Sequence, residues 1–362
     1  MIAHENSVQQ ATWRKLKKNK AAVFGMFIIL IATLLAISAY LIAPDASPNA
    51  NRMIVEIGGL KPGTRQLFFK EKKERPVKTV GFIERLLYGQ DEAYSYIPVN
   101  GYNILKDSVI VKKYIDEGVQ EIIRYPIARF EKPVEKNFVT KTLWLGTDKY
   151  GRDILSRLIV GIRVSLSVGL IAIIISLTIG IVLGAIAGYF RGWIDDVIMW
   201  LINIIWSIPT LLLVFAITLL LGKGFWQVFI AVGLTMWVSV ARIVRGQVLS
   251  VRELEYVEAA RALGFSDGRI IFRHILPNIL GPVLVVAASN FASAIVIEAG
   301  LSFLGVGVQP PQPSWGVMIK ENYNFIITHN PMLALAPGFA IMLLVLAFNL
   351  LGTGLRDALN VK

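Results

Sequence analysis

The stretch EYVEAARALGFSDGRIIFRHILPNIL, residues 255–280, contains two short helical patterns separated by a glycine. Its first part consists of strong helix formers, and Gly264 suits the left-handed position that ends a helix. Ser266 can cap a second helix, whose apolar face runs over residues 270–275 until Pro277 breaks the pattern. We therefore expect a helix, a turn and a second helix, and the alanines in the first helix leave little bulk to hinder insertion into a partner's groove.

The composition places this stretch in a membrane protein. Hydrophobic residues make up 55% of the 362 residues and charged residues only 17%, which is far from the balance of a soluble domain. The chain has no cysteine, which excludes a disulfide, a thiolate metal site and a catalytic thiol. In such a chain the net charge of +12 is explained first by Lys and Arg in cytoplasmic loops, not by nucleic acid binding.

Six apolar stretches predict six membrane-spanning helices. They cover residues 21–43, 165–189, 197–221, 225–240, 279–303 and 332–351. A basic, cytoplasmic amino terminus (1–20) precedes the first span, and Pro209 is expected to kink the third. Arginines crowd the loop 241–278, so it and both termini are expected in the cytoplasm. The core 146–362 then holds five spans.

Residues 44–145 are a water-exposed insert between the first two spans, and we predict a small extracytoplasmic α+β domain. Alternating residues in NILKDSVIVKKY (103–114) favour strands, and IDEGVQEIIRY (115–125) favours a short helix. Two roles are open for the insert: a docking surface for a solute-binding protein, or a lid without a part in substrate delivery.

The stretch LGTDKYGRDILSRL, residues 145–158, superficially resembles a phosphate loop. A phosphate loop needs a Lys and a Ser or Thr after its last glycine, but Arg152 and Asp153 stand there, and the stretch is predicted outside the cytoplasm. We expect an amphipathic helix at the outer interface instead, with Asp153 and Arg157 paired at i,i+4.

Three glycines at four-residue spacing, Gly180, Gly184 and Gly188, leave one face of the second span nearly flat. Small residues at this spacing allow another helix to approach closely. We predict a helix-packing surface there, without a part in chemistry.

Three stretches carry a resemblance to a known family. Glu258-Ala259-Ala260, Gly264 and Leu276-Pro277 resemble the "EAA" loop of ABC-importer permeases, although His274 stands where the general pattern has Ile. LGTDKYGRDILSRLIVGIRVSL (145–166) and EAGLSFLGVGVQPPQPSWGVMI (298–319) resemble the second permease subunit of oligopeptide, dipeptide and nickel importers. The resemblance covers nearly the whole chain except residues 45–140, where the family usually has a much shorter connection.

The resemblance implies an all-α permease of the type I importer fold in the cytoplasmic (inner) membrane of a bacterium. It implies a second permease subunit, two cytoplasmic ATPase subunits and an extracytoplasmic solute-binding protein as partners, with lipid around the spans. The EAA loop would transmit ATP hydrolysis, while ATP and Mg would bind the partners and this chain would carry no cofactor. The sequence offers no metal-ligand cluster or nucleophile–base pair, so we expect no enzymatic activity of the chain itself.

Glu298 has two readings, because ionisable groups near lipid are rare and often functional. It could face the pathway or a gate, or it could lie at the outer end of its helix. Short peptides are the expected substrate, with nickel or another small solute as the alternative. An ion-gradient-driven transporter is a rival of another class, which would need paired acidic or polar groups in broken helices. A membrane-anchored receptor whose function lies in the external insert is a further rival, although five further spans are more than an anchor requires.

Overall fold

The computed structural model describes residues 12–77, 79–327 and 330–359. The chain divides into two compact units, which we describe one at a time. The helical unit comprises Met1–Thr33, Ser165–Gln309 and Ala340–Lys362. The sheet unit comprises Leu34–Val164 and Pro310–Phe339.

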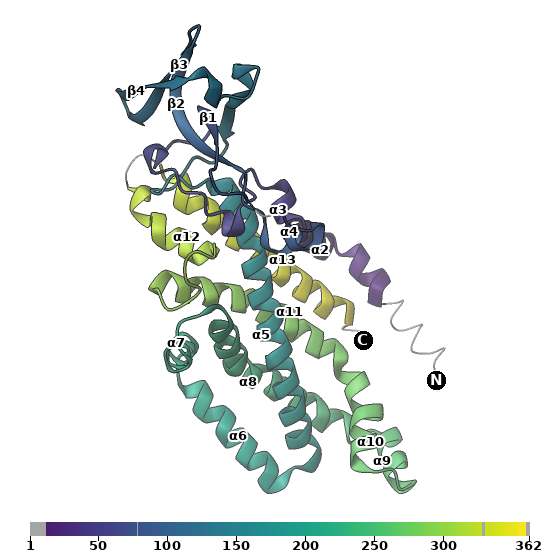
Figure 1. Ribbon diagram of the computed structural model, residues 1–362. Coiled ribbons are helices and arrows are strands. Elements are labelled where there is room, and N and C mark those ends of the chain that lie inside the picture. The colour runs from purple at the N-terminus through teal and green to yellow at the C-terminus, as the bar shows by residue number, and fades with distance from the viewer. Residues whose placement is uncertain (1–11, 78, 328–329, 360–362) are drawn as a thin grey trace. The chain divides into compact units, whose positions relative to one another are not determined.

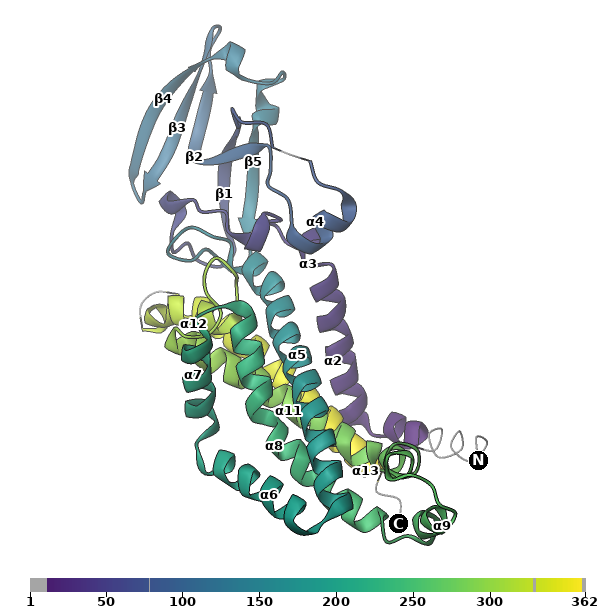
Figure 2. The same cartoon turned by 60° about the horizontal axis from the view of Figure 1, so that its bottom comes forward.

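The sheet unit is built on five antiparallel strands in the order β4-β3-β2-β1-β5. Figure 1 labels β1 to β4, and Figure 2 labels all five strands. The strands are β1 (Thr64–Lys72), β2 (Tyr94–Ile104), β3 (Ser108–Asp116), β4 (Val119–Pro126) and β5 (Phe138–Leu143). The helices α3 (Ala39–Ile42), α4 (Phe82–Tyr88) and α12 (Trp315–Asn322) belong to the same unit, with short turns η1 (Pro48–Ala50), η2 (Val55–Ile57), η3 (Ile127–Arg129), η4 (Val134–Asn137) and η6 (Tyr323–Ile326).

Each face of the sheet carries a hydrophobic cluster, since neighbouring residues of a strand point to opposite faces. Phe69 packs on one face with Val99 of β2 and with Phe130, which follows η3. Phe68 packs on the other face with Ile57 of η2. The sheet therefore has a hydrophobic core of its own on each side.

The short helix predicted for residues 115–125 is wrong. These residues form the end of β3, a turn and most of β4, and the two strands pair from Ser108↔Pro126 to Asp116↔Val119. Gly118 has a φ of 77° in the turn, a conformation that glycine adopts at little cost. The many residue pairs between the two strands therefore outweigh the helix propensity of the Glu and Gln residues.

Five helical stretches are long and apolar enough to cross a membrane, among the residues that the structure describes. They are Lys20–Ile37, Ile154–Phe190, Phe225–Val251, Asp267–Leu304 and Met332–Leu359. These stretches correspond to α2 (Lys20–Ile37), α5 (Ile154–Phe190), α8 (Phe225–Val251), α10 (Asp267–Ile270) continued through η5 (Ile271–Ile275) into α11 (Leu276–Leu304), and α13 (Met332–Leu359).

The third predicted span is broken into two helices, α6 (Gly192–Ser207) and α7 (Thr210–Leu221), which are bent by 94° relative to each other (Figure 2). The break lies at Ile208, which is extended, and Pro209, which precedes the first residue of α7. Proline has no amide hydrogen and restricts the preceding residue to extended conformations. The kink predicted at Pro209 is thus a full break, and the described residues contain five candidate spans, or six if the bent pair counts as one span.

The three glycines of α5 face α8 at very short range. A Cβ added to Gly180 would lie 2.5 Å from Val240 Cβ, and one added to Gly184 would lie 2.5 Å from the carbonyl oxygen of Ala241. At Gly188 it would lie 2.8 Å from the carbonyl oxygen of Arg245. No larger side chain fits without moving the helices apart, so this seam fixes α5 against α8.

Candidate functional site

The segment between α8 and α11 contains two short helices, as predicted. We call residues 254–278 the α9–α10 segment. Its first helix is α9 (Glu255–Ala262), and Gly264 follows with a φ of 77° before α10 begins at Asp267. Ser266 lies at the amino-terminal cap position of α10, but its side chain makes no capping hydrogen bond. The preceding helix α8 continues to Val251, beyond the predicted end of the span at residue 240.

The predicted coupling residues lie on different faces of this segment. Ala260 is buried, together with Val257 and Ile270, in one cluster with Val244 of α8. Glu258, Ala259 and Gly264 are exposed. Two large apolar side chains are also exposed, Leu263 at 74% and Phe272 at 70%. One face of the segment is thus part of the protein core, and the other presents Glu258 beside small and apolar groups to its surroundings.

Polar contacts hold the α9–α10 segment to α5 and join its own two ends. The hydroxyl of Tyr189, near the end of α5, donates a hydrogen bond of 2.6 Å to Asp267 Oδ1. The Asn278 amide donates to the carbonyl oxygen of His274 at 2.6 Å and to the hydroxyl of Tyr256 at 3.1 Å. Burial raises the pKa of Tyr256, so this hydroxyl keeps its proton at neutral pH. Asp267 therefore attaches the segment to α5, while Asn278 and Tyr256 join its two ends to each other.

Pro277 does not break the second helix, contrary to the prediction. A π-helical turn, η5, connects α10 to α11, and Pro277 lies in the first turn of α11. Proline is tolerated in the first turn of a helix, and a π turn changes the hydrogen-bond register just before it. Leu276 is half-buried and Pro277 exposed. The α9–α10 segment therefore continues into the long apolar helix without a flexible joint after α10.

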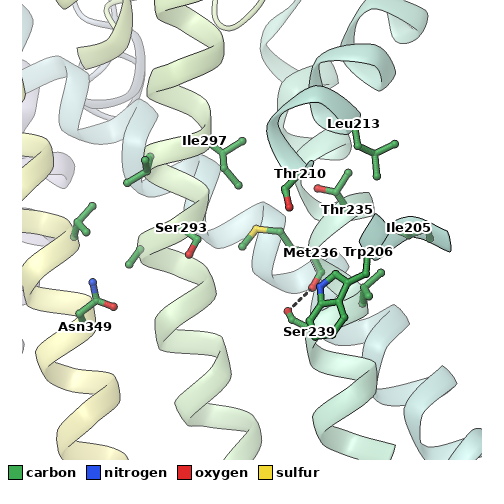
Figure 3. Close-up of a pocket in the computed structure, with 14 residues that line it drawn as sticks. Ile205, Trp206, Thr210, Leu213, Thr235, Met236, Ser239, Ser293, Ile297 and Asn349 are labelled. Atoms are coloured by element: carbon green, nitrogen blue, oxygen red, sulfur yellow. Dashed lines mark hydrogen bonds between the residues drawn. The ribbon is translucent and has the colours of Figure 1, made fainter. Parts of the chain in front are cut away.

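A pocket of about 460 Å³ lies in the helical unit, between the bent pair α6 and α7 and the helices α8, α11 and α13 (Figure 3). It is lined by Ile205, Trp206, Thr210, Leu213, Thr235, Met236, Val238, Ser239, Ala292, Ser293, Val296, Ile297, Val345 and Asn349. Hydroxyl and amide groups are interspersed with apolar side chains, and the lining contains no ionisable residue. Such a surface can hold a small polar molecule through weak neutral hydrogen bonds.

A polar contact joins two helices beside the pocket. The Asn290 amide on α11 donates a hydrogen bond of 3.2 Å to Ser239 Oγ on α8. Ser239 Oγ also lies 2.9 Å from the carbonyl oxygen of Met236. Hydrogen bonds of this kind between membrane helices contribute about 1 kcal/mol, so the pair supports one wall of the pocket.

Glu298 is fully buried within α11, at 0% exposure. Its Oε1 accepts a hydrogen bond of 2.6 Å from Ser302, and Ser302 Oγ in turn accepts one of 3.0 Å from the amide of Val308. The side chain does not line the pocket. Within this chain Glu298 thus belongs to an internal network that holds the loop after α11 against the helix.

The LGTDKYGRDILSRL stretch is an ordered loop followed by the start of α5 at Ile154, not an amphipathic helix along its whole length. Asp148 is buried, and its carboxylate accepts hydrogen bonds from the Arg152 amide and from Arg152 Nε. Arg152 also lies 2.6 Å from Glu321 of α12. The charged residues therefore bond to the protein itself, which is the opposite of a loop open to phosphate.

The predicted Asp153–Arg157 pair is not formed. Asp153 accepts hydrogen bonds from the amide and hydroxyl of Ser156, and Arg157 lies 3.4 Å from Glu321. Burial raises the pKa of the Asp153 carboxyl, while the bonds from Ser156 lower it. The i,i+4 spacing is outweighed here, because Asp153 caps the helix and Arg157 reaches another one.

Comparison with known proteins gives two matching families. Residues 180–362 match the binding-protein-dependent transport system inner membrane components, and residues 7–57 match the N-terminal TM domain of oligopeptide transport permease C. The dipeptide transport system permease protein DppC of Alkalihalophilus pseudofirmus is 46% identical over 219 residues, 60% of this chain and 72% of the relative. The glutathione transport system permease protein GsiD of Pectobacterium atrosepticum is 43% identical over the same shares. A MetNI methionine ABC transporter structure in an inward-facing conformation is 18% identical, with a TM-score of 0.47 over 57% of this chain and 97% of that one.

The apolar helices and the sequence matches together define an integral membrane protein of the ABC-importer permease class. The chain belongs to the family of binding-protein-dependent transport system inner membrane components. The resemblance to oligopeptide and dipeptide permeases is confirmed. Members of this family are transport components. The two matched ranges leave residues 58–179 between them, and the whole β-sheet lies in that interval.

Sequence reasoning did not find the pocket. Its lining comes from five helices that are distant along the chain, and no local motif marks such a meeting point. The available signal was a set of isolated polar residues in apolar stretches, of which Asn290 proves to bond to a pocket residue.

Proposed function

We propose that this chain is a permease subunit of an ATP-driven importer of short peptides. It would lie in the cytoplasmic membrane of a bacterium with both termini in the cytoplasm, and its helices would form the pathway together with a second permease subunit. Two ATPase subunits would bind ATP and Mg on the cytoplasmic side, and a solute-binding protein would deliver the substrate from outside. Residues 44–145 would then be extracytoplasmic.

The observation that carries this proposal is the two-faced α9–α10 segment. Its inner face is packed into the core between α5, α8 and α11, and its outer face exposes Glu258, Ala259 and Leu263. A partner that grips the outer face and moves would move the packed helices with it, because packed interfaces shift as rigid bodies. The segment is thus suited to convert motion of an ATPase subunit into a change of the membrane helices.

Two observations favour peptides as the substrate. The relatives at 43% to 46% identity are named as dipeptide and glutathione permeases, and both names denote small peptides. The pocket offers neutral hydroxyl and amide groups, which suit peptide bonds of varied sequence. An importer of nickel or another small solute is the alternative, and an ion-gradient-driven transporter is the rival mechanism.

The proposal is tested by purifying the chain in mild detergent with the products of its neighbouring genes, and by reconstituting the complex in vesicles. We expect ATPase subunits and a second permease to copurify, and peptide uptake to require ATP. Uptake that follows an ion gradient without ATP would overturn the mechanism, and uptake of nickel but of no peptide would overturn the substrate.

The role of the α9–α10 segment has its own test. Gly264→Pro and Glu258→Arg should leave the complex folded but reduce ATP-driven uptake by at least about tenfold, because proline cannot adopt the positive φ and the new charge opposes docking. Lys223→Glu, a charge change of equal size at an exposed site between α7 and α8, is the matched control. Normal uptake in both test variants would remove the assignment.

A further inference from the structure

A positively charged side chain lies against one residue of the pocket lining. Trp206, near the end of α6, lines the pocket. The guanidinium carbon of Arg242 lies 4.1 Å from the centre of the Trp206 ring. Arg242 is on α8, three residues after the pocket residue Ser239, and residues at this spacing lie on the same face of a helix. The stacked pair therefore stands next to the pocket, toward the α9–α10 end of α8.

Arg242 has a different electrostatic environment from the next arginine on the same helix. Arg245 is paired with Asp195 through two hydrogen bonds of 2.5 and 2.6 Å. Arg242 makes no ion pair within the described ranges, and its charged group lies against the Trp206 ring. An arginine keeps its charge in any protein environment. A cation without a counter-ion next to a neutral pocket is a site where an anionic group is favoured.

The geometry of the stack leaves the guanidinium able to bind such a group. A planar guanidinium stacked over an aromatic ring uses its face, while its N–H donors point outward in its own plane. A carboxylate accepts two parallel hydrogen bonds from this arrangement. The Arg242 guanidinium lies against the Trp206 ring, and within the described ranges no hydrogen bond engages its N–H donors.

We propose that Arg242, held on Trp206, binds the free carboxylate of a peptide whose remaining groups occupy the pocket. This inference rests on the proposed function, since it names the chemical group that the same permease recognises. Short peptides carry one carboxylate at their carboxyl end, and the pocket volume of about 460 Å³ suits a ligand of that size. The pair makes the permease itself selective for peptides with a free carboxyl end.

The phosphate of a lipid headgroup is another anion that Arg242 could meet, since it too accepts bidentate hydrogen bonds. The two ligands predict different results. Binding of the peptide carboxylate makes the pocket sensitive to the carboxyl end of the peptide. Binding of a lipid phosphate makes it sensitive to the lipid composition and indifferent to the peptide.

The absence of cysteine from the chain allows a direct binding assay. Ser293→Cys places a thiol on the pocket wall, where Figure 3 shows Ser293 beside the open space. The complete importer carrying this variant is reconstituted in vesicles, and the rate of thiol labelling on this chain is measured with dialanine or with its carboxyl-terminal amide. We expect dialanine to slow labelling at least about fivefold and the amide to have little effect, because the amide cannot form the ion pair.

Three further variants complete the assay in the Ser293→Cys background. Arg242→Gln should abolish protection by dialanine. Arg242→Lys should retain part of it, since lysine keeps the positive charge but cannot donate the two parallel hydrogen bonds of a guanidinium. Lys223→Gln removes one positive charge at the other end of α8 and should leave protection unchanged. Equal protection by the two peptides, no protection by either, or undiminished protection in Arg242→Gln would overturn the inference.

Two more measurements distinguish failure of the Arg242 inference from failure of the proposed function. Labelling in vesicles of zwitterionic and of anionic lipid tests the other ligand: a rate that follows the lipid and not the peptide assigns Arg242 to lipid phosphate and overturns the inference. ATP-dependent peptide uptake is measured in the same vesicles. Uptake without selective protection refutes only the role of Arg242, whereas absence of any ATP-dependent uptake refutes the proposed function.

Discussion

The two sides of α8 are built in opposite ways. Toward α5, Val240, Ala241 and Val244 lie against glycines at distances that leave no room for another carbon atom. Toward the pocket, Thr235, Met236 and Ser239 border open space. One helix thus carries a tightly packed face that fixes its position and another face that borders a pocket. Substitutions on the two faces should therefore separate stability from transport.

The largest loss of stability is expected from a substitution in the seam between α8 and α5. Gly184→Leu should lower stability by about 3 kcal/mol or more, because its first side-chain carbon already collides with the α8 backbone. Gly246→Leu is the matched control, since a Cβ at Gly246 meets nothing within 4 Å. Thermal unfolding of both purified variants in detergent measures the difference. Equal melting temperatures would show that the seam does not hold the helices together.

A smaller loss of stability is expected from a substitution at the ion pair that attaches α6 to α8. Asp195→Asn should destabilise the protein by about 1–2 kcal/mol, because Arg245 loses a bidentate ionic partner. Asp196→Asn removes the same charge from the next residue, which is exposed and makes no ion pair within the described ranges. Denaturation in detergent compares the two variants, and a similar loss in both would assign the effect to net charge instead of the pair.

A substitution at the border between the two faces of α8 should lower stability still less. Ser239→Ala removes the acceptor of the Asn290 amide and should cost about 1 kcal/mol or less, since Asn290 can turn toward the pocket and bind water. Ser250→Ala, at an exposed site of the same helix, should have no effect on the melting temperature. A loss above about 3 kcal/mol in Ser239→Ala would indicate that the pair has no access to water.

The pocket face should show almost no effect on stability. Ser293→Leu adds bulk to open space, so we expect stability within about 0.5 kcal/mol of the unmodified protein. Peptide uptake should fall about tenfold, because the added side chain occupies ligand volume. Ser293→Ala removes only the hydroxyl and is the control. Unchanged uptake in Ser293→Leu would show that the substrate does not enter this pocket.

The sequence predicted features that depend on residues near one another in the chain. The apolar stretches, the two helices around Gly264 and the interruption at Pro209 follow from composition, helix propensity and the covalent geometry of proline. The hairpin of β3 and β4, the Arg157–Glu321 contact and the pocket depend on distant segments. Local spacing favoured a helix for residues 115–125 and an Asp153–Arg157 pair, and in both cases more distant partners offered better contacts.

The register of the sheet has a consequence for how the sheet is joined to the rest of the chain. Thr64, the first residue of β1, is paired directly with Leu143, the last residue of β5. The chain therefore enters and leaves the sheet at points about 5 Å apart, which a short link of one or two residues can bridge. Removal of the strands with the segments between them thus leaves two chain ends that can be joined directly, and another module could be inserted by design at the same two points.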